Sequence, residues 1–441
     1  MFKKLVQYVM VGLLAIAPVG GLLSAQTTKV AAASTPVSLP TAPQIDASAA
    51  IALDPATGQV LYEQNADQAL PIASMTKMIT AYIVLAQIKQ GKLTWEQTVK
   101  PDDLIYQLSQ NKDLTNVPLQ ADGQYTVKAL FQAMMVASAN DAAMMLANQV
   151  AGSQKDFVDL MRQKVADWGI QDAQLYSVSG LNNEFLGAEV YPGSPADAEN
   201  EMSAADVALV AQKLLADYPE ILETTKQAHF TFGAQTSDET AMSTWNLMLP
   251  GENNAPQDYV VDGLKTGTTD KAGDCFTGTA TKDGQRILTV VMHANGEDTG
   301  RRFIETNKLM QYVFDGWEQK QLAQANQSLA PYKTATVKYG RQKTVQLITN
   351  KAISMWVPKG TTAANIDWHY QAVKGGAKRQ LEAPIKKNVQ IGQVMPQLNG
   401  VTTRYIGQAP QSQLRTKTAD PKANLFVLIG EGIKEFFTNL F

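Results

Sequence analysis

The chain has 441 residues, of which 45% are hydrophobic, and its formal net charge at neutral pH is −3. A chain of this length and composition can bury two cores, and its length suggests two or three domains. The single cysteine, Cys275, excludes a framework of intrachain disulfide bonds. The three histidines stand in no recognisable nucleophile or metal-ligand context, so neither a histidine-based triad nor a metal centre is indicated.

The first residues have the pattern of a secretory signal peptide. Lys3 and Lys4 precede a long apolar stretch, and three consecutive alanines follow it. We predict a signal peptide over residues 1–33, with an earlier cut after Ala25 as the alternative, and a linker over residues 34–45. An exported protein does not meet nucleic acid, so no nucleic-acid partner is expected.

The sequence Ser-Met-Thr-Lys at positions 74–77 follows Pro71 and opens an apolar helical pattern. Ser74 would lie in a first helical turn, where free backbone N–H groups favour a developing negative charge. Lys77 shares a helix face with Ser74, so its amine can reach the serine oxygen. Its apolar neighbours predict burial, which would lower its pKa towards about 7–8 and let the neutral amine accept the serine proton. The alternative is a serine N-cap followed by a solvated lysine.

Ser138-Ala139-Asn140 interrupts a methionine-rich helical stretch over residues 127–150. The neighbouring small residues allow close backbone approach, and polar groups in such a place need partners. We expect a turn between two core helices that projects Ser138 and Asn140 into a cleft. A turn in which Asn140 only caps the second helix is the simpler alternative.

The sequence Lys265-Thr266-Gly267-Thr268 has the pattern of a strand, with a glycine where another backbone must come close. A lysine and hydroxyl groups beside an edge strand can bind a terminal carboxylate while the strand pairs with an extended peptide. Lys265 would also be the second cation that lowers the pKa of Lys77. Two further apolar runs and a helix follow, which predicts an antiparallel meander closed by a helix.

Residues 322–410 consist of short apolar runs separated by Gly, Pro, Asn and Lys, which predicts a small all-β domain. Residues 331–420 contain fourteen Lys and Arg against three acidic residues. This balance suggests contact with an anionic surface, such as a membrane or wall polymers. A solvated basic face that only aids solubility fits the same pattern equally well.

Residues 411–441 are predicted to form a linker and an amphipathic helix. From Asn424 onwards, apolar side chains gather on one helical face and polar side chains on the other. The segment is too short and too polar to span a bilayer, whereas a helix lying in the membrane interface fits it. A helix docked on the protein's own core is the alternative.

The motifs S-x-x-K, S-x-N and K-T-G form the signature set of penicillin-binding proteins and class A β-lactamases. With the flanking segments Pro71-Ile-Ala-Ser-Met-Thr-Lys-Met and Gly263-Leu-Lys-Thr-Gly, residues 46–321 resemble the catalytic domain of the low-molecular-mass D-alanyl-D-alanine carboxypeptidases of the penicillin-binding protein 5 type. The resemblance implies a β-lactamase/transpeptidase-like α/β (α+β) domain, in which an antiparallel sheet is flanked by helices and an all-helical subdomain. A second small all-β domain and a C-terminal amphipathic helix complete the expected fold.

The resemblance also implies catalytic roles for four residues. Ser74 would be the acylated nucleophile and Lys77 its base. Ser138 and Asn140 would relay a proton and position the substrate. The backbone N–H groups of Ser74 and Thr268 would form the oxyanion hole.

The same resemblance implies a subsite for the substrate carboxylate. Its expected residues are Lys265, Thr266, Gly267, Thr268 and Arg301. The family uses an arginine downstream of the K-T-G strand, and Arg302 is the other candidate for that role.

The expected activity is therefore removal of the terminal D-alanine from peptidoglycan stem peptides, on the outer face of the cytoplasmic membrane. β-Lactams should acylate the same serine, and the chemistry requires no metal or organic cofactor. A D,D-endopeptidase, a transpeptidase or a β-lactamase would use the same site. A non-turnover β-lactam sensor or a wall-binding protein is the alternative from another class.

Overall fold

The computed structural model describes residues 37–233, 239–296, 298, 300–373, 379–407 and 409–438. The predicted signal peptide over residues 1–33 lies outside the described residues, as does the start of the linker that follows it. Within the described part of the chain, no helix is long and apolar enough to cross a membrane.

A five-stranded antiparallel sheet runs in the order β2-β1-β11-β10-β9. Its strands are β1 (Ala47–Leu53), β2 (Val60–Gln64), β9 (Val260–Thr269), β10 (Gly273–Lys282) and β11 (Gln285–Ala294). The predicted meander is formed by β9, β10 and β11. Strand β9 is the edge of the sheet, so the K-T-G motif has a neighbouring strand on one side only.

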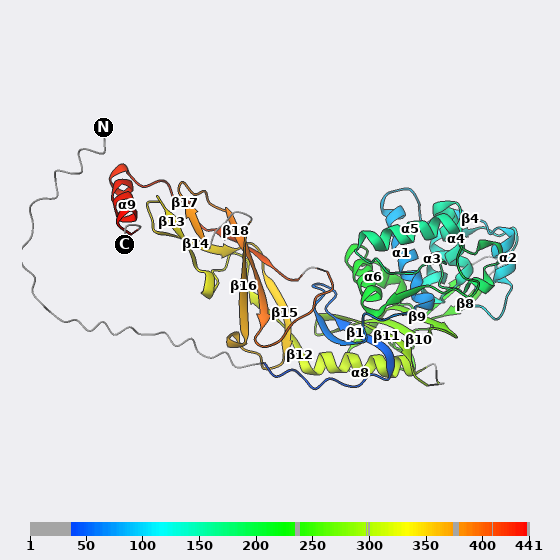
Figure 1. Cartoon of the computed structure of the whole chain (residues 1–441). Coiled ribbons are helices and arrows are strands. Elements are labelled where there is room, and N and C mark those ends of the chain that lie inside the picture. Colours follow the sequence, from blue (N-terminus) through cyan, green and yellow to red (C-terminus); the bar gives the residue numbers. More distant parts are fainter. Residues whose placement is uncertain are drawn as a thin grey trace, which may run out of the picture. The chain divides into compact units, whose positions relative to one another are not determined.

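Each face of this sheet buries a separate core, because successive side chains of a strand point to opposite faces. Val290 packs into the core with helices α1 (Lys77–Lys89) and α6 (Ala204–Asp217), whereas Val291 packs into the core with α8 (Arg301–Gly316). Figure 1 shows α8 along one side of the sheet and α1 and α6 on the other. The sheet thus separates α8 from the helix that follows the S-x-x-K motif.

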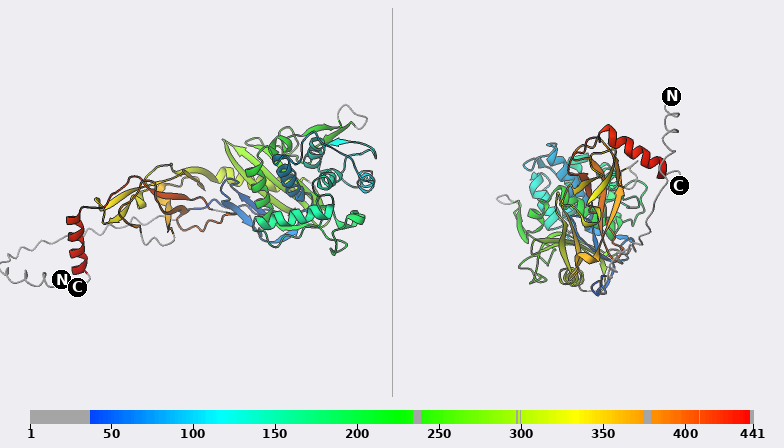
Figure 2. Two further views of the ribbon diagram at one scale, coloured as in Figure 1. Left: turned by 90° about the horizontal axis from the view of Figure 1, so that it is seen from above. Right: turned by 90° about the vertical axis from the view of Figure 1, so that its left-hand side faces the viewer.

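A helical subdomain lies next to α1, and Figure 2 shows its helices, coloured cyan to green, gathered together. Its helices are α2 (Asp103–Ser109), α3 (Val127–Val136), α4 (Asn140–Ala151), α5 (Gln154–Asp167) and α7 (Ile221–Thr225). The break between α3 and α4 lies at Ser138, as expected. The segment from Asp102 to Tyr125 contains α2, whose first turn is capped by the Asp102 side chain.

Three short antiparallel pairs brace the loops of this part of the chain. They are β3 (Ala69–Pro71) with β6 (Glu201–Ser203), β4 (Thr98–Val99) with β5 (Tyr125–Thr126), and β7 (His229–Phe232) with β8 (Thr240–Ser243). The first pair holds the segment that leads into the S-x-x-K motif.

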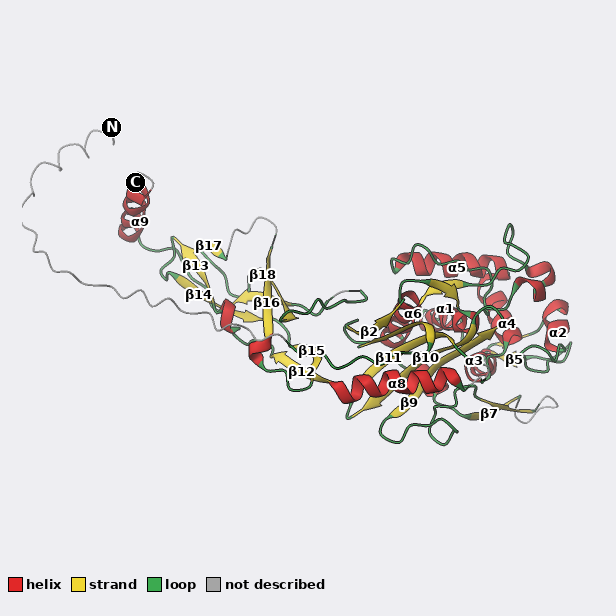
Figure 3. Ribbon diagram, turned by 60° about the horizontal axis from the view of Figure 1, so that its bottom comes forward, coloured by secondary structure: helices red, strands yellow, loops and turns green. Residues whose placement is uncertain are grey.

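The predicted all-β domain is present, and Figure 3 shows strands as its main elements. Strands β12 (Trp317–Ala323) and β15 (Ile353–Pro358) form a two-stranded sheet. A six-stranded sheet contains, in spatial order, β16 (Ile366–Ala372), β18 (Gln390–Leu398), β19 (Ser412–Thr416), β14 (Thr344–Thr349), β13 (Thr334–Lys338) and β17 (Gln380–Glu382). Strands β12, β17 and β19 were not predicted, because each is short or polar and is stabilised by pairing with distant segments.

The C-terminal segment forms helix α9 (Leu425–Thr438). Leu428 is partly buried, and the other described apolar side chains are exposed; they are Leu425, Phe426, Val427, Ile429 and Ile433. The last three residues of the predicted amphipathic segment lie outside the described residues.

Candidate active site

Ser74 lies in a 3₁₀ turn, Ala73–Thr76, and helix α1 begins at Lys77. The sequence predicted a helix opening at Ser74, and the structure begins it with this tighter turn. The spacing of three residues brings the two side chains together, and Lys77 Nζ donates a hydrogen bond of 2.8 Å to Ser74 Oγ.

The turn that carries Ser74 is held against a neighbouring backbone. Ala73 has a φ of +45°, which is uncommon for a residue with a side chain. Gly180 lies against it so closely that a Cβ there would stand 1.9 Å from the Ala73 carbonyl oxygen. Only glycine permits this approach, which places the carbonyl of Ser179 next to Lys77.

Lys77 is completely buried and donates to three oxygen atoms, none of which belongs to a carboxylate. These are Ser74 Oγ, Asn140 Oδ1 and the Ser179 carbonyl, each at 2.8 Å. Burial, together with the positive charge of Lys265, lowers the pKa of Lys77 well below its ordinary value. The amine therefore loses its proton more easily than an exposed lysine and can accept one from Ser74.

Ser138 and Asn140 lie where α3 ends and α4 begins. Ser138 has a φ of +64°, so the connection turns sharply at this residue. Asn140 Nδ2 donates to the Thr115 carbonyl at 3.0 Å, which orients the amide so that Oδ1 accepts from Lys77. The N-cap of α4 is Ala139, which makes no side-chain cap, so Asn140 does not cap the helix. The turn instead brings Ser138 to the cleft and Asn140 to Lys77.

Lys265 connects the edge strand β9 to the helical subdomain. Its Nζ donates to Ser138 Oγ at 2.9 Å and to the Thr266 carbonyl at 3.1 Å. Burial and the nearby charge of Arg302 lower the pKa of Lys265 to about 7. A carboxylate bound here would favour the protonated amine and raise that pKa again.

Gly267 allows β9 to pack against the turn that carries Ser74. A Cβ at this position would lie 2.8 Å from the Ile72 carbonyl oxygen. The next residue, Thr268, is exposed at the end of the cleft. The backbone of β9 therefore lies directly against the backbone of the turn that carries Ser74.

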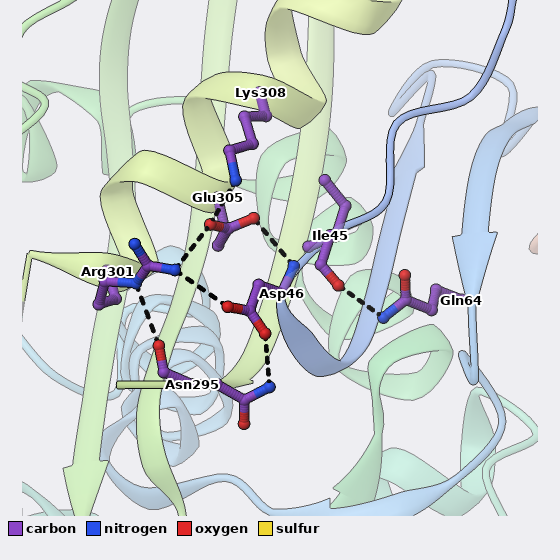
Figure 4. A network of polar contacts seen from close by, with 7 residues as sticks. All are labelled: Ile45, Asp46, Gln64, Asn295, Arg301, Glu305 and Lys308. Atoms are coloured by element: carbon purple, nitrogen blue, oxygen red, sulfur yellow. Dashed lines mark hydrogen bonds and ion pairs between the residues drawn. The ribbon is translucent and has the colours of Figure 1, made fainter. Parts of the chain in front are cut away.

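Arg301, the arginine favoured from the sequence, does not lie at this cleft. It pairs with Asp46 at 3.0 Å and with Glu305 at 3.6 Å, and donates to the Asn295 carbonyl at 3.1 Å (Figure 4). The carboxylate of Glu305 also pairs with Lys308 and accepts from the Asp46 backbone N–H. Arg301 thus fastens the start of α8 to the segment before β1.

Arg302 lies at the cleft in place of Arg301. It is buried and forms an ion pair with Asp274 on β10. It also donates to the Gly267 carbonyl at 3.0 Å, to Thr268 Oγ1 at 2.8 Å and to the Cys275 carbonyl at 3.3 Å. Consecutive helix residues point about 100° apart. One arginine therefore faces β9 and the other faces β1.

A cleft of about 380 Å³ opens onto Ser74 and Ser138, whereas Lys77, Asn140 and Lys265 do not line it and are buried next to lining residues. Its lining residues are Ser74, Thr115, Ser138, Thr244, Trp245, Leu247, Thr266, Gly267, Thr268, Arg302 and Phe303. Sequence reasoning did not identify Thr115, Thr244, Trp245, Leu247 or Phe303. None of these residues belongs to a motif. The one feature of the sequence that could have indicated this part of the cleft is Trp245, an isolated tryptophan between polar residues.

The comparisons with known proteins agree with this architecture. Residues 36–296 match the family model described as D-alanyl-D-alanine carboxypeptidase, and residues 317–414 match the model of the penicillin-binding protein 5 C-terminal domain. D-alanyl-D-alanine carboxypeptidase DacC of Escherichia coli is 32% identical, over 81% of this chain and 82% of its own length.

Two solved structures are also similar. A peptidoglycan synthesis regulatory factor (PBP3) from Streptococcus pneumoniae superimposes with a TM-score of 0.72 and 36% identity, over 86% of this chain and 100% of the other. Penicillin-binding protein D2 from Listeria monocytogenes in the ampicillin-bound form has a TM-score of 0.51 and 31% identity, over 62% of this chain and 99% of the other.

Proposed function

Because the chain belongs to the D-alanyl-D-alanine carboxypeptidase family and is a serine hydrolase of that activity, we propose that Ser74 carries its acyl-enzyme. The observation that carries this proposal is the contact between Lys77 Nζ and Ser74 Oγ at 2.8 Å. Among the described residues, no carboxylate accepts a hydrogen bond from Lys77, and its lowered pKa supplies the neutral amine that a general base requires.

The proposed reaction has two stages, acylation of Ser74 and hydrolysis of the acyl-enzyme. Ser74 Oγ attacks the carbonyl carbon of the penultimate D-alanine while its proton passes to Lys77 Nζ. The backbone N–H groups of Ser74 and Thr268 stabilise the oxyanion. Lys77 Nζ passes this proton to Ser138 Oγ while Ser138 gives its own proton to the leaving nitrogen, so the C–N bond breaks and D-alanine leaves. Water then attacks the ester carbonyl, one of its protons passes through Lys77 to Ser74 Oγ, and the shortened peptide leaves with a new carboxyl group.

The leaving residue carries a free carboxylate, and the proposed subsite for it lies on β9. Lys265 and Thr266 would bind it, and Gly267 would let the strand come close to Ser74. Arg302 replaces Arg301 in this proposal and acts mainly by holding Gly267 and Thr268 in place, since it already donates to both. The substrate is therefore a peptidoglycan stem peptide that ends in D-Ala-D-Ala.

The Ser74→Ala variant tests the nucleophile. Release of D-alanine from a diacetyl-Lys-D-Ala-D-Ala peptide should fall by at least about 10³-fold in this variant, because the acyl-enzyme cannot form. Penicillin should block release by the unmodified protein, and labelled penicillin should bind to it but not to the variant. Labelling of Ser74 without release of D-alanine would instead indicate that the site acts as an endopeptidase or a transpeptidase.

The same proposal places the exported protein on the outer face of the cytoplasmic membrane, anchored by α9. Most of the described apolar side chains of α9 are exposed. Five exposed cations lie on those turns of the β-domain that are close to the first residues of α9. They are Arg341, Lys386, Lys387, Lys417 and Lys422, and the backbone bonds of Arg341 with Pro421 and of Ile385 with Asp420 hold these turns together. Such a surface suits anionic lipid headgroups or anionic wall polymers.

Deletion of residues 424–441 tests the anchor. The shortened protein should leave the membrane fraction and should no longer float with vesicles that contain phosphatidylglycerol, because the apolar face of α9 is lost. Release of D-alanine from a soluble peptide serves as the control and should be retained. Unchanged partition to membranes would show that α9 has another purpose, and binding to isolated wall polymers alone would favour the second anionic partner.

A further inference from the structure

Trp245 is the largest apolar side chain at the rim of the cleft, and it is 56% exposed. Its indole is nevertheless fixed, because Nε1 donates to the Ala137 carbonyl at 3.1 Å. Leu247 and Phe303 line the same cleft and extend its apolar wall. A large exposed ring held beside a reactive serine calls for a role in substrate recognition.

The loop that carries Trp245 is held by several hydrogen bonds of Asn246. Asn246 is buried, and its Nδ2 donates to the Gly263 carbonyl on β9 at 3.5 Å. The same side chain accepts from the Met248 backbone N–H at 3.1 Å, and the Asn246 N–H donates to Thr244 Oγ1 at 3.0 Å. The backbone on both sides of Trp245 is therefore held in one conformation.

The indole connects the two walls of the cleft. Ala137 directly precedes Ser138 on the helical wall, and Gly263 lies on the strand that carries Lys265. The loop is bonded to the strand wall through Asn246 and to the helical wall through the indole N–H. Trp245 and Asn246 together therefore link the two walls, at the part of β9 that contains Gly263.

This part of β9 lies on the leaving-group side of the proposed reaction. Along β9 the oxyanion position is at Thr268, the carboxylate subsite is at Thr266, and Gly263 lies three residues further back, at about 3.3 Å per residue. A leaving group of one residue ends near the carboxylate subsite. A leaving group of three residues continues for two residues, about 7 Å, beyond the carboxylate subsite, towards Leu264 beside Gly263, where the loop that carries Trp245 is bonded.

We propose that Trp245 closes the leaving-group end of the cleft and so confines the enzyme to the free carboxyl end of a peptide. This inference rests on the proposed role of Ser74 and names the feature that excludes longer leaving groups. A rigid ring hydrogen-bonded across the cleft cannot move aside without losing that bond, so a longer chain meets a steric barrier.

The test compares two substrates that share one acyl group. Diacetyl-L-Lys-D-Ala-D-Ala has a leaving group of one residue, and diacetyl-L-Lys-D-Ala-D-Ala-Gly-Gly has a leaving group of three. For each variant of the full chain, kcat/KM is measured for cleavage after the first D-alanine in both peptides. In Trp245→Ala the ratio of extended to short substrate should rise at least about tenfold above that of the unmodified protein.

Two matched variants separate size from other effects. Trp245→Phe keeps a smaller ring without the N–H and should give a ratio between that of the unmodified protein and that of Trp245→Ala. Phe185→Ala removes an exposed aromatic residue that does not line the cleft, and should leave the ratio unchanged. A fault in folding lowers kcat/KM for both peptides equally and therefore does not change the ratio.

An unchanged ratio in Trp245→Ala, with penicillin labelling of Ser74 intact, would overturn the inference. If Trp245→Ala does not fold, the same ratio is measured for Trp245→Leu, since leucine is also too small to close the cleft. Failure of the proposed function has a different signature, because the unmodified protein would then cleave neither peptide in a Ser74-dependent way.

Discussion

Replacing Lys77 by alanine should slow acylation of Ser74 by about 10²–10⁴-fold, the range expected for loss of a general base. The amine lies 2.8 Å from Ser74 Oγ and is the only described basic side chain hydrogen-bonded to it. The measurement is the rate at which labelled penicillin reacts with the variant under conditions of excess reagent.

The fold should survive this substitution. Two acceptors, Asn140 Oδ1 and the Ser179 carbonyl, lose their lysine donor, which costs about 1–3 kcal/mol for each group left unsatisfied. Removal of a desolvated amine offsets part of that loss. Lys89→Ala, at the exposed end of the same helix, is the matched control and should react normally. Normal labelling of Lys77→Ala would remove Lys77 from the mechanism.

The pH dependence of acylation provides a second check on the same group. A protonated Lys77 cannot accept a proton, so the rate should fall as the pH is lowered through its depressed pKa. Lys265 has the opposite requirement, because its protonated form binds a carboxylate, and its pKa of about 7 moves upward when the anion binds. The acid limb of the profile should be absent from the residual activity of Lys77→Ala.

Replacing Arg302 by alanine should destabilise the protein by about 3–5 kcal/mol, the effect of removing one partner from a buried ion pair. The side chains of Arg302 and Asp274 are only 7% and 9% exposed, so the remaining carboxylate would be left buried without its partner. Urea unfolding at neutral pH measures the free energy of unfolding. Burial already raises the pKa of Asp274, and the arginine opposes that rise.

The sign of the pH effect follows from that carboxylate. Without Arg302, the folded-state pKa of Asp274 should rise further above its unfolded value. The destabilisation should therefore shrink as the pH falls and Asp274 becomes protonated. The double variant Arg302→Ala with Asp274→Asn should recover most of the stability at neutral pH, because no charge is then buried alone.

The double variant also separates the two roles of Arg302, which are neutralising Asp274 and holding Gly267 and Thr268 in place. Its stability can recover without recovery of its activity. The double variant still lacks the donors to the Gly267 carbonyl and to Thr268 Oγ1. We therefore expect its kcat/KM for the D-Ala-D-Ala peptide to remain low. A double variant with full activity would show that Arg302 serves only to neutralise Asp274.

The family, the fold class and the activity expected from the three motifs are confirmed by the family models and the relatives. Each motif depends on local geometry, which the sequence specifies directly. Residues three apart meet on one helical turn, so Ser74 and Lys77 could be paired from spacing alone. Gly267 could be assigned to a close backbone contact because no other residue type fits there.

The choice between Arg301 and Arg302 depended on packing instead. Both belong to the first turn of α8, and a rotation of about 100° decides which of them faces β9. That rotation follows from how the apolar side of α8 packs on the sheet, with Leu309 and Val313 buried in the core. Local sequence does not contain this information, because the sheet is assembled from segments far along the chain.

The sequence by itself therefore determined which reactive groups are present and which of them are neighbours on a single turn or strand. The tertiary structure decided their environment. Burial and the charge of Lys265 lower the pKa of Lys77, and its amine contacts Asn140, 63 residues away, and the Ser179 carbonyl, 102 residues away. Trp245 reaches Ala137 across 108 residues. Desolvation and steric closure arise from all the groups around a site together, and only the folded chain brings those groups into contact.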